Sequence, residues 1–128
     1  MSYHFSKTLD VPFDQAIART TEALKREGFG VLTDIDVAAT MKAKLGEDFR
    51  PYRILGACNP QLANRALKLE DKIGTMLPCN VIVQQHEDGD VEVSAVDPVA
   101  SMQAIQNPGL ADVAREVRAR LKRVVDGL

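Results

Sequence analysis

Two Cys-Asn pairs are the residues of this chain that point most directly to chemistry. Cys58 and Cys79 are its only cysteines, and each is followed by an asparagine, Asn59 or Asn80. Thiols can hold a soft metal or exchange with a disulfide, and an amide can orient a bound molecule. The repeated pair therefore indicates a place where a ligand, a metal or a redox partner could act.

The elements expected around these pairs decide whether the thiols can meet. The pattern predicts that one strand ends at Cys58 and that the next begins at Cys79. If these strands are antiparallel neighbours, the end of one lies beside the start of the other, and the two thiols can approach. Asn59 is a suitable N-cap for a helix opening at Pro60. The partial positive charge of that helix N-terminus favours a thiolate at Cys58.

Three interpretations of the thiols stay open. Free cysteine is among the most buried residue types, so both side chains could simply pack. Cys58 and Cys79 could instead line a ligand pocket or supply half of a metal site. A zinc site needs about four ligands, however, and the sequence positions of His4 and His86 do not indicate that they join the cysteines. In the third, Cys58 attacks a disulfide and Cys79 resolves it. No particular cofactor is indicated.

Arginine and tyrosine side chains precede the first Cys-Asn pair. Arg50, Tyr52 and Arg53 bring two guanidinium groups and a phenol to the start of the strand that ends at Cys58. Guanidinium groups can clamp an anionic ligand through paired hydrogen bonds. We therefore expect these three residues, together with Asn59 and Asn80, to line a pocket beside the cysteines.

Length and composition set limits on the class of protein. The chain has 128 residues, 45% of them hydrophobic and 27% charged, which suits a single domain over residues 1–128. Its net charge of −2 offers no field to recruit nucleic acid or an anionic membrane. No apolar run approaches the roughly 20 residues of a membrane span, and the first residues lack a signal-peptide pattern. We expect a cytoplasmic protein with reduced thiols.

Catalytic motifs are missing from the sequence. It contains no phosphate-binding glycine loop, no nucleophile elbow and no H-E-x-x-H helix. A binding module is therefore favoured over an enzyme, and a purely structural or interaction domain is the remaining alternative.

Periodicity and turn residues predict an α+β domain. Strands are expected over residues 3–9, 31–36, 52–58, 79–85 and 91–96, with Tyr3, Phe5 and Leu9 on one face of the first strand and Lys7 interrupting it. Long helices are expected from Pro12 to the stop at Gly28 and from Pro108 to the end of the chain. Short helices fall between the strands.

The two long helices each carry an apolar stripe that needs a partner. An antiparallel sheet of about five strands, with the N- and C-terminal helices on one face, would bury both stripes in two layers. The sheet edges and its second face would remain open, so we expect a homodimer to cover them.

Several short motifs together resemble a known family, the bacterial and archaeal domain of unknown function 302. The resemblance covers almost the whole chain and is carried by these segments: Gly28-Phe29-Gly30-Val31-Leu32, Ile35-Asp36-Val37, Lys44-Leu45-Gly46, Tyr52 to Pro60, Leu77-Pro78-Cys79-Asn80-Val81, and Asp97-Pro98 with Met102. It implies a TATA-binding-protein-like fold, strand-helix-four strands-helix, and members associated as homodimers. It supplies no activity and no catalytic residue, and a shared fold gives no reason to expect DNA binding.

Overall fold

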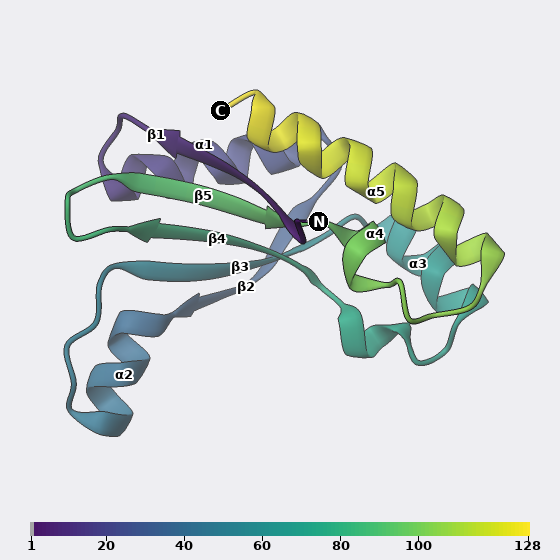
Figure 1. The fold of residues 1–128 in the computed structure, drawn as a ribbon, viewed down its shortest axis with the longest axis horizontal. Coiled ribbons are helices and arrows are strands. Elements are labelled where there is room, and N and C mark those ends of the chain that lie inside the picture. The colour runs from purple at the N-terminus through teal and green to yellow at the C-terminus, as the bar shows by residue number, and fades with distance from the viewer. Residues whose placement is uncertain (1) are drawn as a thin grey trace.

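A computed structural model describes residues 2–128. Its core is a five-stranded antiparallel sheet in the order β1-β5-β4-β3-β2 (Figure 1). The strands are β1 (His4–Leu9), β2 (Gly30–Asp36), β3 (Tyr52–Cys58), β4 (Cys79–Gln85) and β5 (Val91–Val96). The helices are α1 (Phe13–Arg26), α2 (Val37–Leu45), α3 (Pro60–Leu69), the 3-10 helix η1 (Ile73–Met76), α4 (Pro98–Ser101) and α5 (Pro108–Asp126). The predicted α+β fold class and element order are confirmed.

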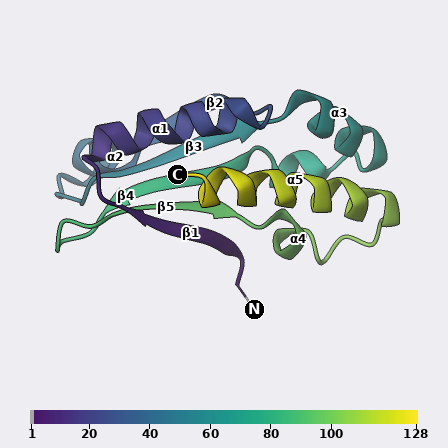
Figure 2. The ribbon, with the colours of Figure 1, turned by 90° about the horizontal axis from the view of Figure 1, so that it is seen from above.

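The two long helices form the second layer. Seen from above, α1 and α5 lie side by side over one face of the sheet, and they contact each other as well as the strands (Figure 2). Their apolar stripes and the alternate strand residues that face them build the main core, from Ala16 and Leu24 through Val81 and Val93 to Leu121. Burying both stripes against the sheet is the main source of stability for this arrangement.

Helix starts follow the residues that the sequence offers as caps. Asp36, Asn59, Asp97 and Asn107 each accept a backbone N–H bond at the start of α2, α3, α4 and α5, respectively. Three of these caps precede a proline, whose missing N–H costs nothing in the first turn. The predicted start at Pro60 and the predicted strand bounds 52–58, 79–85 and 91–96 are confirmed.

In the first strand, the structure corrects the expected position of Tyr3 and explains why Lys7 interrupts the apolar face. Tyr3 lies outside β1 and is 71% exposed, so it does not join Phe5 and Leu9 on the buried face. Lys7 does lie on the helix side of the sheet, where its Nζ donates to the main-chain oxygens of Asp126 (3.1 Å) and Leu128 (2.6 Å). The lysine interrupts the apolar face because it binds the free carbonyls at the end of α5.

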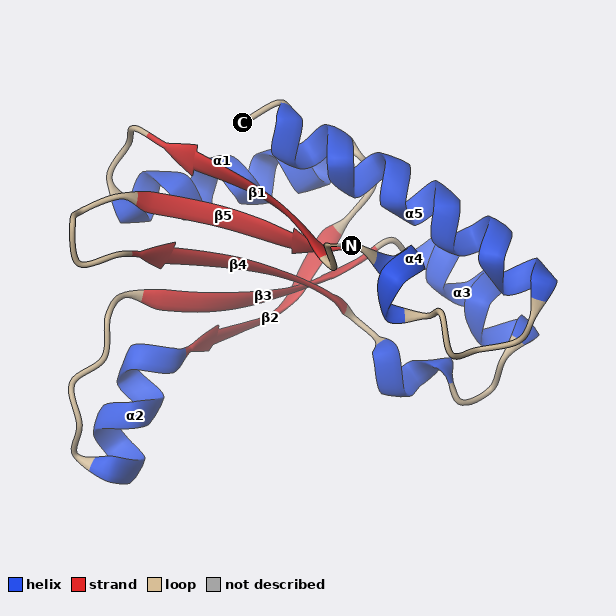
Figure 3. Ribbon diagram, viewed as in Figure 1, coloured by secondary structure: helices blue, strands red, loops and turns tan. Residues whose placement is uncertain are grey.

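The two ends of the sheet differ in what surrounds them. At one end α2 projects from the body, and none of its residues is buried (Figure 3). At the other end α3, η1 and α4 gather around the close of β3 and the start of β4. Gly56 keeps that end compact, because a Cβ there would collide with Thr33 Oγ1 and stand 2.7 Å from Pro78 Cγ. Both Cys-Asn pairs lie at this second end.

Candidate functional site

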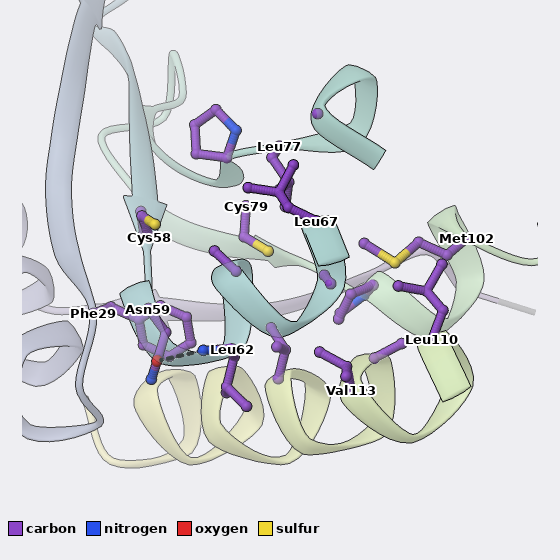
Figure 4. Close-up of a pocket in the computed structure, with 18 of the residues that line it drawn as sticks. Phe29, Cys58, Asn59, Leu62, Leu67, Leu77, Cys79, Met102, Leu110 and Val113 are labelled. Atoms are coloured by element: carbon purple, nitrogen blue, oxygen red, sulfur yellow. Dashed lines mark hydrogen bonds between the residues drawn. The ribbon is translucent and has the colours of Figure 1, made fainter. Parts of the chain in front are cut away.

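An apolar cavity of about 320 Å³ lies at the end of the sheet that carries the Cys-Asn pairs. Its walls come from the last residues of β3, the first of β4, and the facing sides of α3, α4 and α5. Figure 4 shows it extending from Phe29 and Asn59 at one end to Met102 and Leu110 at the other. Its volume falls in the range of small-molecule sites, which are usually concave and mostly apolar.

Both thiols lie on the wall of this cavity. Ala57 of β3 pairs with Cys79 of β4, so Cys58 lies one residue beyond the pair and just before α3. Cys58 is partly exposed and Cys79 is buried, and neither forms a disulfide. The antiparallel pairing of β3 and β4 therefore brings two thiols, 21 positions apart in sequence, to one cavity.

The electrostatics of the cavity keep one thiol neutral. Burial, and secondarily the neighbouring charge of Cys58, raise the pKa of Cys79 from 9.0 to about 11. A buried thiolate loses its hydration, so the protonated form is favoured. At neutral pH Cys79 is therefore a small apolar group rather than a nucleophile.

Asn59 holds the cavity wall together. Its side chain accepts a bond from Leu62 N (3.2 Å) at the start of α3, and its amide nitrogen donates to Glu27 O (3.4 Å) just after α1. Gly28 allows this approach, because it has a φ of 85° and a Cβ there would stand 2.9 Å from the Asn59 amide nitrogen. The amide of Asn59 thus positions two helix ends beside Cys58.

Asn80 lies on the other side of the sheet. Strand residues alternate between faces, so the residue after Cys79 turns away from the cavity. Asn80 is exposed and lines a groove of about 390 Å³ across the open face, together with Tyr52 and Gln84. Asn80 does not line the cysteine cavity, because it lies inside a strand whereas Asn59 follows one, although Asn80 and Cys79 both line a smaller hollow beside η1.

The structure also separates the arginines and tyrosine from the cysteines. Tyr52 opens β3 and Cys58 closes it, about 20 Å away at the usual rise of a strand. Arg50 donates to Gln84 Oε1 (3.0 Å), and its guanidinium carbon lies 5.3 Å from the Tyr52 ring centroid. The expected anion clamp beside the thiols is therefore wrong for Arg50 and Tyr52.

Arg53 has a partner of its own. Its guanidinium group donates two hydrogen bonds to the carboxylate of Asp34 on β2, with Nε to Oδ1 at 2.7 Å. This pairing lowers the pKa of Asp34 and raises the pKa of Arg53, mainly through the hydrogen bonds. Arg53 ties the edge strand to the sheet and takes no part in the cavity.

The far end of the cavity is built by residues that no sequence motif marks as a site. Met102 follows α4, and Leu110 and Val113 belong to α5. Met102 was noted only within the family resemblance, and the others belong to an ordinary helical stripe. No local signal marks them, because only the packing of α5 against α3 and α4 brings them opposite the thiols.

No cluster of metal ligands and no membrane-spanning helix occur among the described residues. Over residues 2–128 no group of three or more His, Cys, Asp or Glu side chains could hold a metal ion. Cys58 and Cys79 alone are fewer ligands than structural zinc sites use. Within the same residues, none of the helices combines the length and apolarity needed to cross a bilayer.

Comparisons with known proteins agree with the resemblance seen in the sequence. The family model described as Domain of unknown function DUF302 matches residues 5–128. A crystal structure of an uncharacterized conserved DUF302 protein from Bacillus stearothermophilus is similar, with a TM-score of 0.91, 32% sequence identity and 98% of each chain covered. Comparison with curated proteins gives no match.

Proposed function

The chain belongs to the DUF302 family, and we propose that it is a binding module that holds an apolar small molecule, or the apolar part of one, in the cysteine cavity. The observation that carries this proposal is the cavity's lining. No Asp, Glu, Lys, Arg or His is among its lining residues, and its polar groups are the two thiols and Asn59. The amide of Asn59 is already engaged by α3 and by Glu27.

Access to the cavity supports a ligand rather than a sealed void. Leu32 and Leu67 line it while being 68% and 45% exposed. Apolar side chains held at the surface beside a hollow are typical of binding sites, because leaving them in water is unfavourable. A ligand entering here would cover them and remove its own apolar surface from water.

The thiol chemistry favours binding over redox exchange. Exchange through Cys58 and Cys79 needs a thiolate on each sulfur in turn. The pKa of Cys79, raised to about 11, leaves almost none of its thiolate at neutral pH. A neutral Cys79 instead extends the apolar wall.

A neutral fluorescent probe tests the proposal. N-phenyl-1-naphthylamine should bind the native protein with increased emission and a stoichiometry of one per chain. Ala63→Phe should abolish binding, because Ala63 lines the cavity and the larger ring would fill it. Ala18→Phe is the matched control, since Ala18 is exposed on α1 and does not line the cavity. Absence of binding to the native protein, or equal binding by both variants, would remove the proposal.

We also propose that two copies associate through β2, α2 and the open sheet face. Every β2 residue except Val31 is exposed, and Leu45 of α2 is 65% exposed. Because a helix this short is marginal on its own, a partner surface would stabilise it. Sedimentation should give a dimer mass, and Ile35→Glu with Leu45→Glu should give the monomer. Leu69→Glu, at another exposed apolar position, should leave the dimer intact; a monomeric native protein would refute the association.

A further inference from the structure

Two smaller hollows adjoin the cysteine cavity. A second hollow of about 220 Å³ lies between α4 and α5, and it shares Met102, Leu110 and Ala114 with the cavity. A third hollow of about 250 Å³ beside η1 shares Leu77, Pro78, Cys79 and Met102 with it. Met102 is therefore the side chain that all three spaces have in common.

The Met102 side chain lies between the cavity and the second hollow and is suited to change its conformation there. It follows the single turn of α4, is only partly buried, and packs against the smaller apolar cluster that contains Leu110. Figure 4 places its thioether at the end of the cavity farthest from Phe29. Methionine is unbranched and has three rotatable side-chain bonds, so it can change rotamer with little strain. Turning it aside would join the cavity to the second hollow.

The second hollow supplies the charge that the cavity lacks. Arg115 is the only charged residue among the side chains that line these three spaces. It pairs with Asp112 one helical turn earlier, and both side chains are about two-thirds exposed. Such an exposed pair is weak, and a guanidinium group has donors to spare for a second oxyanion.

We propose that the ligand of the cavity is a straight-chain carboxylic acid, an inference that rests on the proposed function. The hydrocarbon chain lies along the cavity between Phe29 and Met102, passes the turned Met102 side chain, and presents its carboxylate to Arg115. This placement uses the extent of the cavity from Phe29 to Met102, its uncharged lining, and the cationic group that lines the adjoining hollow. A compact apolar molecule would occupy the cavity alone and would not reach Arg115.

Displacement of the neutral probe by matched acids and alcohols tests the proposal. Saturated acids and primary alcohols of six to fourteen carbons are titrated below their aggregation concentrations. Affinity should rise by up to about fourfold for each methylene until the space is filled. Each long acid should bind about two- to fivefold more tightly than the alcohol of equal length.

Two variants assign the head-group site. Arg115→Gln should remove the preference for acids over alcohols and leave the affinity for alcohols unchanged. Arg19→Gln is the control, because it makes the same charge change on the exposed side of α1; this variant should keep the preference for acids. Ala111→Phe should fill the second hollow and weaken long acids while the neutral probe still binds, since Ala111 lines that hollow and not the cavity.

The outcomes separate the two proposals. If the neutral probe does not bind, both fail. If the probe binds but acids equal alcohols, or Arg115→Gln and Arg19→Gln behave alike, the cavity remains a binding site and the carboxylic acid assignment is overturned.

Discussion

The titration of Cys79 tests the apolar character of the cavity directly. The pKa of this thiol is 9.0 in an ordinary environment and about 11 in the folded protein, mainly because of burial. Below pH 9 the thiol is protonated in both the folded and unfolded states. As the pH rises from 9 toward 11, the unfolded chain releases the proton while the folded protein keeps it. The unfolded state then binds fewer protons, so stability falls with rising pH.

The size of the loss follows from the difference between the two pKa values. A difference of about two units corresponds to about 3 kcal/mol of unfolding free energy, lost once the pH exceeds about 11. Urea unfolding of the native protein and of Cys79→Ala from pH 8 to 11.5 isolates this loss, because the other titrating groups are common to both. The native protein's stability relative to Cys79→Ala should decrease by about 3 kcal/mol. A difference that stays constant across the range would refute a buried, neutral thiol.

A spectroscopic control follows the same thiol alone. In Cys58→Ala, Cys79 is the sole cysteine, and its thiolate can be followed by the ultraviolet absorbance that remains after subtracting the spectrum of the variant that also carries Cys79→Ala. The midpoint should stay well above pH 9, because burial is the larger cause and the charge of Cys58 the smaller one. A midpoint near 9 would show that Cys79 is accessible to water.

Three further substitutions test local packing and hydrogen bonding in the fold, each by urea unfolding. Gly56→Ala should destabilise the protein by about 1–3 kcal/mol through collision with neighbouring atoms, whereas Gly30→Ala, with open space around it, should not. Asn59→Ala should cost about 1 kcal/mol through the lost helix cap, whereas Asn80→Ala on the exposed face should cost little. Thr20→Val should stabilise the protein by about 1 kcal/mol, because the Thr20 hydroxyl is buried without a hydrogen-bond partner, and Thr20→Ser, which keeps that hydroxyl, should not. Equal midpoints within any of these pairs would contradict the corresponding contact.

Local signals predicted the elements well because each is encoded within a few residues. The dipeptides Asn59-Pro60 and Asn107-Pro108 combine a capping side chain with a proline suited to the first turn, and both start helices in the structure. Alternating apolar residues predicted β5. The apolar stripes of the two long helices predicted that α1 and α5 cover one face of the sheet. These patterns lie within single segments of the chain, so they can be recognised without knowing which other segments each one contacts.

The site was less predictable because it depends on distances across the fold. Arg50 and Tyr52 lie close to Cys58 in sequence, but an extended strand separates residues by about 3.3 Å each, and six such steps span the sheet. Met102 and Leu110 lie far away in sequence and yet share the cavity with Cys58. Nearness in sequence is therefore a poor indicator of this site, whereas the antiparallel pairing of β3 with β4 correctly places the two thiols together.

The two Cys-Asn pairs show how one dipeptide acquires two roles. At Cys58-Asn59 the strand has ended, so the backbone bends into α3 and both side chains reach the cavity wall. At Cys79-Asn80 the strand has just begun, and alternation sends the thiol inward and the amide to the open face. The cavity thus receives two thiols and a single amide that already bonds α3 and Glu27. A wall with so few free polar groups selects ligands by shape and apolar area, which is why chain length is the sharpest variable with which to test it.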